Sequence, residues 1–224
     1  MKILFVSDLH KTLESLEEME SVDWLLSIID AVKPDYLISA GDMGEAITAY
    51  DLQRITSRTK AIIVYGNHEN FPVIKDYCVR DGQVIELGNL KVSGINGLVE
   101  EDEERKGRRR EYAFDVRLLA RLSKKLKGVD VLVSHQPPYL PEVYPGMRYS
   151  PGLEAFTRFL YEVRPKLHLN GHMTGGCYTY YEFSWGGRYL RVDSSSRHRC
   201  YAVIEEGRVT VYERSAEIFA FEWG

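Results

Sequence analysis

The chain has 224 residues, of which 44% are hydrophobic and 28% are charged, proportions typical of a soluble globular protein with a substantial core. We expect a single domain over residues 1–224. The formal net charge of −4 provides no basic excess. We therefore expect neither nucleic acid nor an anionic membrane among the partners of this protein.

The cysteines and the first residues of the chain indicate the cellular compartment in which we expect the protein. The three cysteines, Cys78, Cys177 and Cys200, form no C-x-x-C pair. Because an odd number suits no closed disulfide framework, we expect reduced cysteines and a cytoplasmic protein. The apolar start of the chain is too short for a signal peptide, and no segment approaches a membrane-spanning length.

In the first third of the chain, short apolar runs alternate with segments of helical periodicity. Lys2 to Ser7 is nearly continuous in apolar side chains, which is typical of a strand covered on both faces. The expected elements are strands over 2–7, 36–40 and 61–65 and helices over 13–33 and 46–57. This alternation predicts a parallel sheet with right-handed helical crossovers.

The rest of the chain adds a second group of strands. The expected elements are a short helical piece over 73–77, a hairpin of 84–87 and 90–94, helices over 115–127 and 153–163, strands over 129–133 and 167–170, and antiparallel strands over 177–183, 188–192, 200–204 and 209–212. Residues 100–110 are dense in charge and predict a solvated surface loop, with a lid over a substrate phosphate as the alternative. Together these elements imply two sheets packed face to face, with helices outside.

Polar side chains follow five of the expected strands, at the point where each strand ends. They are Asp8, His10, Asp42, Asn67, His68, His135 and His172. Ligands of open α/β sheets bind beyond the carboxyl ends of the strands, so we expect these side chains to meet at one edge. Imidazole and carboxylate groups together favour divalent transition ions. The pattern therefore predicts a site for one or two such ions.

The motifs around these residues resemble those of the calcineurin-like metallophosphoesterases, in the same order, from Lys2 to about Tyr212. They are Asp8-x-His10, Gly41-Asp42, Gly66-Asn67-His68-Glu69, His135 and Gly171-His172. The resemblance implies an α/β fold, namely a four-layer α/β/β/α sandwich of two mixed sheets. A dinuclear metal site would lie at the carboxyl ends of the strands. Ala46, where protein phosphatases of this family place an arginine, favours the small archaeal and bacterial phosphodiesterase-like members.

The resemblance also implies a role for each site residue. The implied ligands are Asp8, His10 and Asp42 for a first ion, and Asp42 as a bridge with Asn67, His135 and His172 for a second. The ions would be Mn, Fe, Zn or Ni, and a hydroxide bridging them would attack phosphorus in line. His68 corresponds to the catalytic histidine of the family. Either Glu45 or Glu69 would orient it, and a helix-terminal charge is the alternative role of Glu45.

This chain departs from the family motif at one position that would affect the first ion. The family often has G-H-x-H, whereas Thr174 stands in place of the second histidine. We therefore expect three protein ligands at the first ion.

The expected function is hydrolysis of a small phosphodiester or phosphomonoester. A catalytically silent binding scaffold and a nuclease are the alternatives, although a scaffold would have to retain an entire unused site. We expect a monomer or a homodimer, because residues 218–223 can pack either internally or between two copies.

Overall fold

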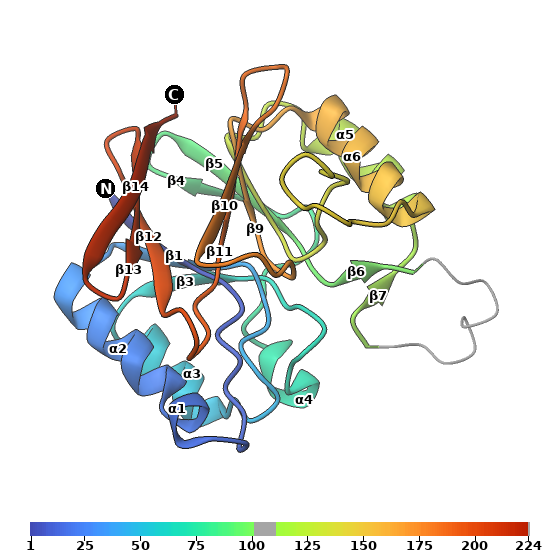
Figure 1. Cartoon of the computed structure of the whole chain (residues 1–224). Coiled ribbons are helices and arrows are strands. Elements are labelled where there is room, and N and C mark those ends of the chain that lie inside the picture. Colours follow the sequence, from blue (N-terminus) through green and yellow to red (C-terminus); the bar gives the residue numbers. More distant parts are fainter. Residues whose placement is uncertain (101–110, 224) are drawn as a thin grey trace.

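The computed structural model describes residues 1–100 and 111–223, and its main elements are two six-stranded sheets (Figure 1). The first sheet has the order β14-β13-β12-β1-β2-β3 and the second β10-β11-β9-β8-β5-β4. The strands of the first sheet are β1 (Lys2–Val6), β2 (Tyr36–Ser39), β3 (Lys60–Ile63), β12 (Cys200–Glu205), β13 (Arg208–Glu213) and β14 (Ala216–Glu222). Those of the second sheet are β4 (Val84–Leu87), β5 (Leu90–Ile95), β8 (Val131–Ser134), β9 (Leu167–Asn170), β10 (Tyr178–Glu182) and β11 (Arg188–Val192).

Helices cover the outer faces of both sheets, which gives four layers (Figure 1). The helices are α1 (Leu16–Met19), α2 (Ser21–Val32), α3 (Ala49–Thr56), α4 (Phe71–Ile74), α5 (Arg117–Lys125) and α6 (Pro151–Val163). A short parallel pair, β6 (Leu98–Val99) and β7 (Ala113–Phe114), stands apart from the sheets. The expected α/β/β/α sandwich of two mixed sheets is thereby confirmed.

The alternation of side chains along β1 explains the layering. Ile3 and Phe5 are buried in the core between the two sheets, whereas Leu4 and Val6 are buried in the core under α2. Successive side chains of a strand point to opposite faces, so a strand covered on both faces must be apolar throughout. A third core lies between the second sheet and the α5–α6 pair.

Several helix boundaries differ from the expected ones, and two of them do so because polar side chains cap the helices. The helix expected over 13–33 begins only at Leu16, where Ser15 accepts a hydrogen bond from the Glu18 N–H, and α1 and α2 are separate helices. The helix expected over 46–57 begins at Ala49, after a capping box of Thr48 and Asp51. The helix assigned to 115–127 begins at Arg117, with Val116 rather than Asp115 at its N-cap.

The chain after residue 177 differs most from the expectation, because its strands are divided between the two sheets. β10 and β11 extend the second sheet, and β12, β13 and β14 extend the first. β11 pairs with β9 in parallel, so the expectation of antiparallel strands is wrong for that pair. β14 was not expected as a strand. Its Phe219 stacks on Tyr178 of β10, with ring centroids 4.8 Å apart, so this segment packs internally against the edge of the other sheet.

A disulfide joins Cys177 to Cys200, so the expectation of reduced cysteines is wrong for this pair. The odd count was misleading because the third cysteine, Cys78, remains free. Cys177 directly precedes β10 and Cys200 begins β12, so the bond connects the two sheets.

In the part of the chain that the structure describes, no helix has the length and apolar character needed to cross a membrane. The prediction for residues 100–110, loop or lid, lies outside the described residues except for Glu100.

Candidate metal centre

The carboxyl ends of β1, β2, β3, β8 and β9 lie at one edge of the sandwich, and the predicted site residues follow them. Four of these residues, Asp8, His10, Asp42 and His172, have left-handed backbones with φ of 56°, 50°, 54° and 70°. They are four of the nine non-glycine residues with positive φ in the described chain. Because this conformation costs an L-residue about 1–2 kcal/mol, the surrounding structure must hold these four residues in it.

The first group of donors consists of Asp8, His10 and Asp42. His10 Nε2 lies 4.0 Å from Asp8 Oδ1 and 3.7 Å from Asp42 Oδ2. One donor atom from each residue lies within 4.8 Å of the other two, a separation that permits all three to bind one ion. Both carboxylates are buried, and His10 is partly exposed. Two carboxylates and an imidazole are a donor set that suits Mn, Fe or Zn.

The second group of donors is centred on Asn67. Its Oδ1 lies 3.2 Å from His135 Nε2 and 2.9 Å from His172 Nδ1. Asp42 Oδ1 lies 3.4 Å from the same His135 nitrogen. Donor atoms about 3 Å apart are spaced as ligands of one ion are, since each ligand bond is about 2.0–2.2 Å long.

Asp42 belongs to both groups, because its two oxygens point in different directions. Oδ2 faces His10 of the first group, and Oδ1 faces His135 of the second. The carboxylate therefore stands where a ligand bridging two ions would stand. The three residues of the first group thus fit one divalent ion, and Asp42 lies where it could also serve the second group.

The surroundings of His135 fix which ring nitrogen faces the donors. Its Nδ1 lies 2.8 Å from the Ala40 carbonyl and donates to it, which leaves Nε2 directed at Asn67 and Asp42. Burial alone would lower the pKa of this imidazole, but the adjacent Asp42 carboxylate raises it to about 9. Nε2 therefore carries a proton at neutral pH, and a divalent ion would take the place of that proton.

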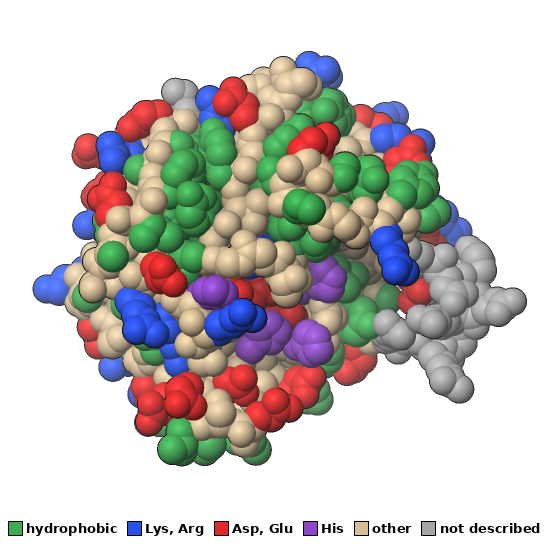
Figure 2. Space-filling model, viewed as in Figure 1, with side chains coloured by type: hydrophobic (Ala, Val, Ile, Leu, Met, Phe, Trp, Pro, Cys, Tyr) green, Lys and Arg blue, Asp and Glu red, His purple; other side chains and the backbone are tan. Residues whose placement is uncertain are grey.

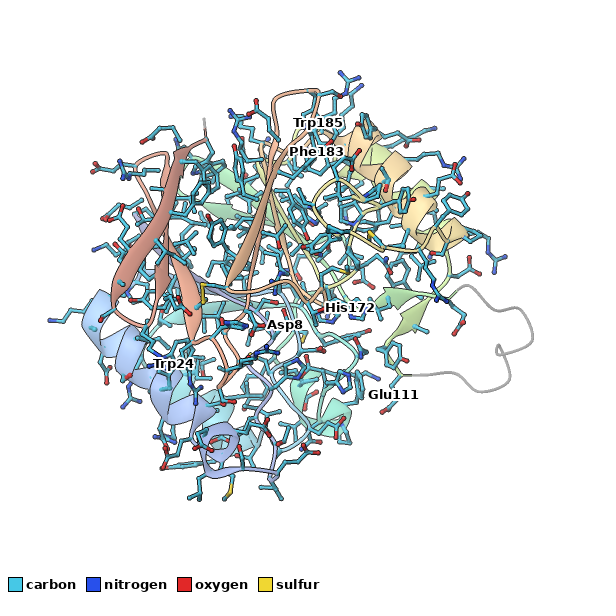
Figure 3. The ribbon with its side chains drawn as sticks, viewed as in Figure 1. Asp8, Trp24, Glu111, His172, Phe183 and Trp185 are labelled. Atoms are coloured by element: carbon cyan, nitrogen blue, oxygen red, sulfur yellow. A yellow bond between two sulfur atoms is a disulfide. The ribbon has the colours of Figure 1, made fainter. Side chains whose placement is uncertain are left out.

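The pKa of His172 is shifted in the opposite direction from that of His135. Burial lowers its pKa to about 4, so the ring is neutral at pH 7 and its lone pair is available. Its backbone N–H donates to Asp8 Oδ1 over 3.0 Å, which joins the last ligand loop to the first. Figure 3 shows Asp8 and His172 close together at the ends of the strands.

Two glycines leave room for the His135 ring. A Cβ on Gly66 would lie 2.1 Å from Asp42 Oδ1 and 2.6 Å from His135 Cε1. A Cβ on Gly171 would lie 2.4 Å from Ser7 Oγ and 2.9 Å from His135 Nδ1. Any larger side chain at these positions must displace the imidazole or Asp42, which explains why glycine precedes the ligand in both motifs.

His68 lies at the exposed side of the first group. Its Nδ1 is 3.2 Å from Glu45 Oε1, and its ring centroid is 5.5 Å from that of His10. Its backbone N–H donates to Asp42 Oδ1 over 2.8 Å. Both the His68 and Glu45 side chains are more than half exposed, at 53% and 69%, so substrate and solvent can reach this pair.

Of the two carboxylates considered for orienting His68, Glu45 makes the contact. Glu69 is buried and accepts hydrogen bonds from the backbone N–H groups of Gly66 and Met43, over 2.9 and 3.1 Å. It therefore joins the turn of Asn67 to the turn of Asp42. Burial raises the pKa of Glu69 to about 8.

The structure thus brings all eight predicted site residues together, and Figure 2 shows histidine side chains gathered around acidic ones on one face of the molecule. Thr174 is exposed, two residues after His172. Outside this set, His168 is fully buried and lies 2.8 Å from Ser134 Oγ, so it belongs to the core.

Sequence reasoning missed the residues that support the ligands. Ser7 donates to Asp8 Oδ2 over 2.6 Å. Asn170 donates to the carbonyls of Ser134 and Gln136, over 2.9 and 3.0 Å, and so holds the backbone on both sides of His135. A polar residue in the last position of an apolar strand was the only available signal, and both Ser7 and Asn170 carry it.

Comparison with known proteins agrees with this geometry. Residues 1–174 match the model of the calcineurin-like phosphoesterase family. No curated protein matches the chain. The fold is similar to that of a dimetal phosphatase from Danio rerio, with a TM-score of 0.65, 13% identity, and 100% of this chain and 99% of that chain covered.

It is also similar to GAP50, described as the anchor in the inner membrane complex of Plasmodium, with a TM-score of 0.61, 9% identity, and 100% of this chain and 88% of that chain covered. At such identities the likeness concerns the fold alone. The family model, however, covers well over half of the chain and contains every predicted site residue. This chain therefore belongs to the calcineurin-like phosphoesterase family.

Proposed function

We propose that this protein is a metal-dependent hydrolase of small phosphoesters, with Asp8, His10 and Asp42 as ligands of one divalent ion and Asp42, Asn67, His135 and His172 as ligands of a second. The observation that carries the proposal is the position of Asp42, whose two oxygens face two separate groups of donors. Family membership and the fold shared with a dimetal phosphatase support it.

The donor set suits Mn, Fe, Zn or Ni, and we leave the choice among them to experiment. When bound, such ions supply Lewis-acid chemistry, since they polarise phosphoryl oxygens and lower the pKa of a water. The family's usual second histidine is replaced by exposed Thr174, so three protein side chains would hold the first ion.

One residue of this chain, His68, would supply a proton during the reaction. Hydrolysis breaks one P–O bond, adds the oxygen of one water to phosphorus, and delivers a proton to the departing oxygen. His68 is exposed, lies beside His10 and contacts Glu45, so it can present that proton to the departing oxygen. Glu45 would position His68 through the contact between Oε1 and Nδ1.

Hydrolysis of paired model esters tests the proposal. We expect the purified protein to hydrolyse nitrophenyl phosphate or bis-nitrophenyl phosphate when Mn, Ni, Zn or Mg is added, and preference for the diester would identify a phosphodiesterase. Failure to hydrolyse either ester with any of these ions would favour the scaffold alternative, in keeping with the similar fold of an anchor protein.

The role of His68 is tested by replacement. His68→Ala should lose about 10²–10⁴-fold in turnover, the usual contribution of a general acid, while its metal content stays that of the wild type. Arg158→Ala, a change on the exposed face of α6, serves as the control. Full activity of His68→Ala would remove His68 from the mechanism.

Other expectations from the sequence stay predictions. We expect a single domain that acts as a monomer or homodimer, without nucleic acid or membrane as a partner. A cytoplasmic location is also retained as a proposal, although the Cys177–Cys200 disulfide removes the argument from reduced cysteines. Counting free thiols tests the cytoplasmic location, provided that the thiols are alkylated in intact cells before the protein is purified. One free thiol means that the disulfide has formed, and three mean that all the cysteines are reduced.

A further inference from the structure

A pocket of about 610 Å³ opens beside His172. The residues that line it come from the β6–β7 pair, the loop after β8, the start of α6 and the His172 loop, and they include Ala113, Gln136, Met147, Arg148, His172 and Met173. Its volume lies within the range of sites that bind small organic ligands, about 300–1,000 Å³. None of the functions assigned above uses this space.

The pocket adjoins one end of the metal centre and not the other. His172 of the second group of donors lines it, whereas neither His68 nor Glu45 does. In Figure 3, His172 lies on the side of the site that faces β6 and β7. A phosphoryl group at the metal centre can therefore extend one substituent toward His68 and a different one into the pocket.

The walls of the pocket are held by hydrogen bonds of their own. Gln136 accepts the backbone N–H of Val99 over 2.8 Å, and its own amide donates to the Pro137 carbonyl over 3.0 Å. Leu98 donates its backbone N–H to the Tyr112 carbonyl over 2.9 Å. These bonds join the β6–β7 pair to the loop after β8, so the space is formed before any ligand enters.

The lining is mostly apolar, and two of its side chains are methionines, Met147 and Met173. Thioether side chains adapt to flat rings and contact them favourably. Arg148 is exposed and lines the same space, and a guanidinium can stack on an aromatic base. The lining thus suits a planar heteroaromatic group with its sugar better than a small polar alcohol.

From this geometry we infer that the substrates are phosphodiesters in which a group of nucleoside size stays bound to phosphorus and occupies the pocket, while the departing group lies beside His68. The inference rests on the proposed function and deepens it. A phosphomonoester has no retained substituent, so its hydrolysis would leave the pocket unused.

Two esters with the same departing group isolate the contribution of the pocket. They are methyl p-nitrophenyl phosphate and thymidine 5′-(p-nitrophenyl phosphate), which both release p-nitrophenolate and differ in the group that stays on phosphorus. We expect kcat/KM to be at least about 10-fold higher for the thymidine ester, since burial of one ring contributes this much or more. Equal values for the two esters would overturn the inference while leaving the proposed function intact.

Variants of the lining test whether the preference arises in this pocket. Ala113→Phe fills the space from β7, and Arg148→Ala removes the guanidinium from its rim. Each should lower the ratio of the two kcat/KM values, Ala113→Phe toward 1 and Arg148→Ala by a few-fold. Arg158→Ala on α6, which does not line the pocket, should leave the ratio unchanged. A ratio of the two kcat/KM values that neither Ala113→Phe nor Arg148→Ala lowers would overturn the inference.

A binding measurement keeps the inference testable without turnover. Calorimetry with thymidine 5′-monophosphate and added Mn²⁺ should show binding that Ala113→Phe weakens at least about 10-fold and Arg158→Ala does not. If neither ester is hydrolysed, the proposed function fails and this measurement alone decides the inference. Binding that Ala113→Phe leaves unchanged would then overturn it.

Discussion

The two groups of donors at the metal centre differ in how firmly the protein holds them. In the first, His10 is partly exposed and three side chains share one ion site. In the second, His135 is fully buried, donates to the Ala40 carbonyl and lies against Gly66 and Gly171. Ligands fixed by buried partners lose little freedom when they bind an ion, so the second site should be the tighter one. If both proposed ions bind, we therefore expect the ion of the first group to exchange more readily than the ion of the second.

The largest effect is expected from Asp42, which belongs to both groups. Asp42→Asn keeps the shape of the side chain but removes the charge that offsets both ions, so both should be lost and turnover should fall by well over ~10²-fold. Metal analysis after dialysis, together with ester hydrolysis, checks this. Asp23→Asn, at an exposed position on α2, is the control. Retention of one full equivalent of metal would show that Asp42 does not bridge.

A smaller and more selective loss is expected from Gly66→Ala. The new Cβ would displace His135 and Asp42 Oδ1, so the second ion should be lost or bound at least about 10-fold more weakly, while His10 and Asp8 stay in place. Titration of bound metal per chain measures this.

Gly128→Ala is the matched control, because its Cβ would meet nothing within 4 Å. Its φ of 82° adds a backbone strain that Gly66 does not have, so metal loss in Gly66→Ala but not in Gly128→Ala would come from the close contacts at residue 66. Two equivalents of tightly bound metal in Gly66→Ala would contradict the close approach at His135.

Metal affinity at the second site should depend on pH because of His135. Its pKa is raised from 6.5 to about 9, so in the metal-free protein this group contributes stability that is complete below pH 6.5 and lost as the pH rises through about 9. Metal binding must expel the same proton. Affinity should therefore increase up to ~100-fold between pH 6.5 and 8.5. Calorimetry at the two pH values measures it, and equal affinities would mean that His135 carries no such proton.

The smallest effect is expected at the first site. Thr174→His supplies the ligand that this chain lacks and should tighten retention of the first ion by about 10-fold, without change at the second. Metal analysis after extended dialysis checks this. Metal content identical to that of the wild type would show that residue 174 does not reach the first ion.

The ligands could be predicted from the sequence because each stands directly after an apolar run. Buried strands in a parallel sheet end at a common edge, so a chain-order list of strand ends such as Asp8, Asp42 and Asn67 is also a list of neighbours. The identification of Glu45 as the partner of His68 needed the fold, because Glu69 stands adjacent in sequence but points to the backbone of Gly66 and Met43.

The division of the tail between two sheets could not be predicted, because strands such as β11 and β12 show the same alternation of side chains in either sheet. The Cys177–Cys200 pair was missed for a related reason. The two residues meet only because β10 and β12 lie in different sheets with adjacent ends. Nothing in a spacing of 23 residues indicates that contact.

That disulfide has a consequence for how the sandwich holds together. The two sheets pack against each other through a shared apolar core. The bond between Cys177 and Cys200 adds a covalent link between them, and Cys177 lies five residues after His172 in the sequence. In the chain-entropy account, closing a loop of this length restricts the unfolded chain and contributes about 3 kcal/mol. Asp8 follows a strand of one sheet and His172 a strand of the other. The disulfide therefore limits the separation of these two side chains wherever the surroundings are oxidising enough to maintain it.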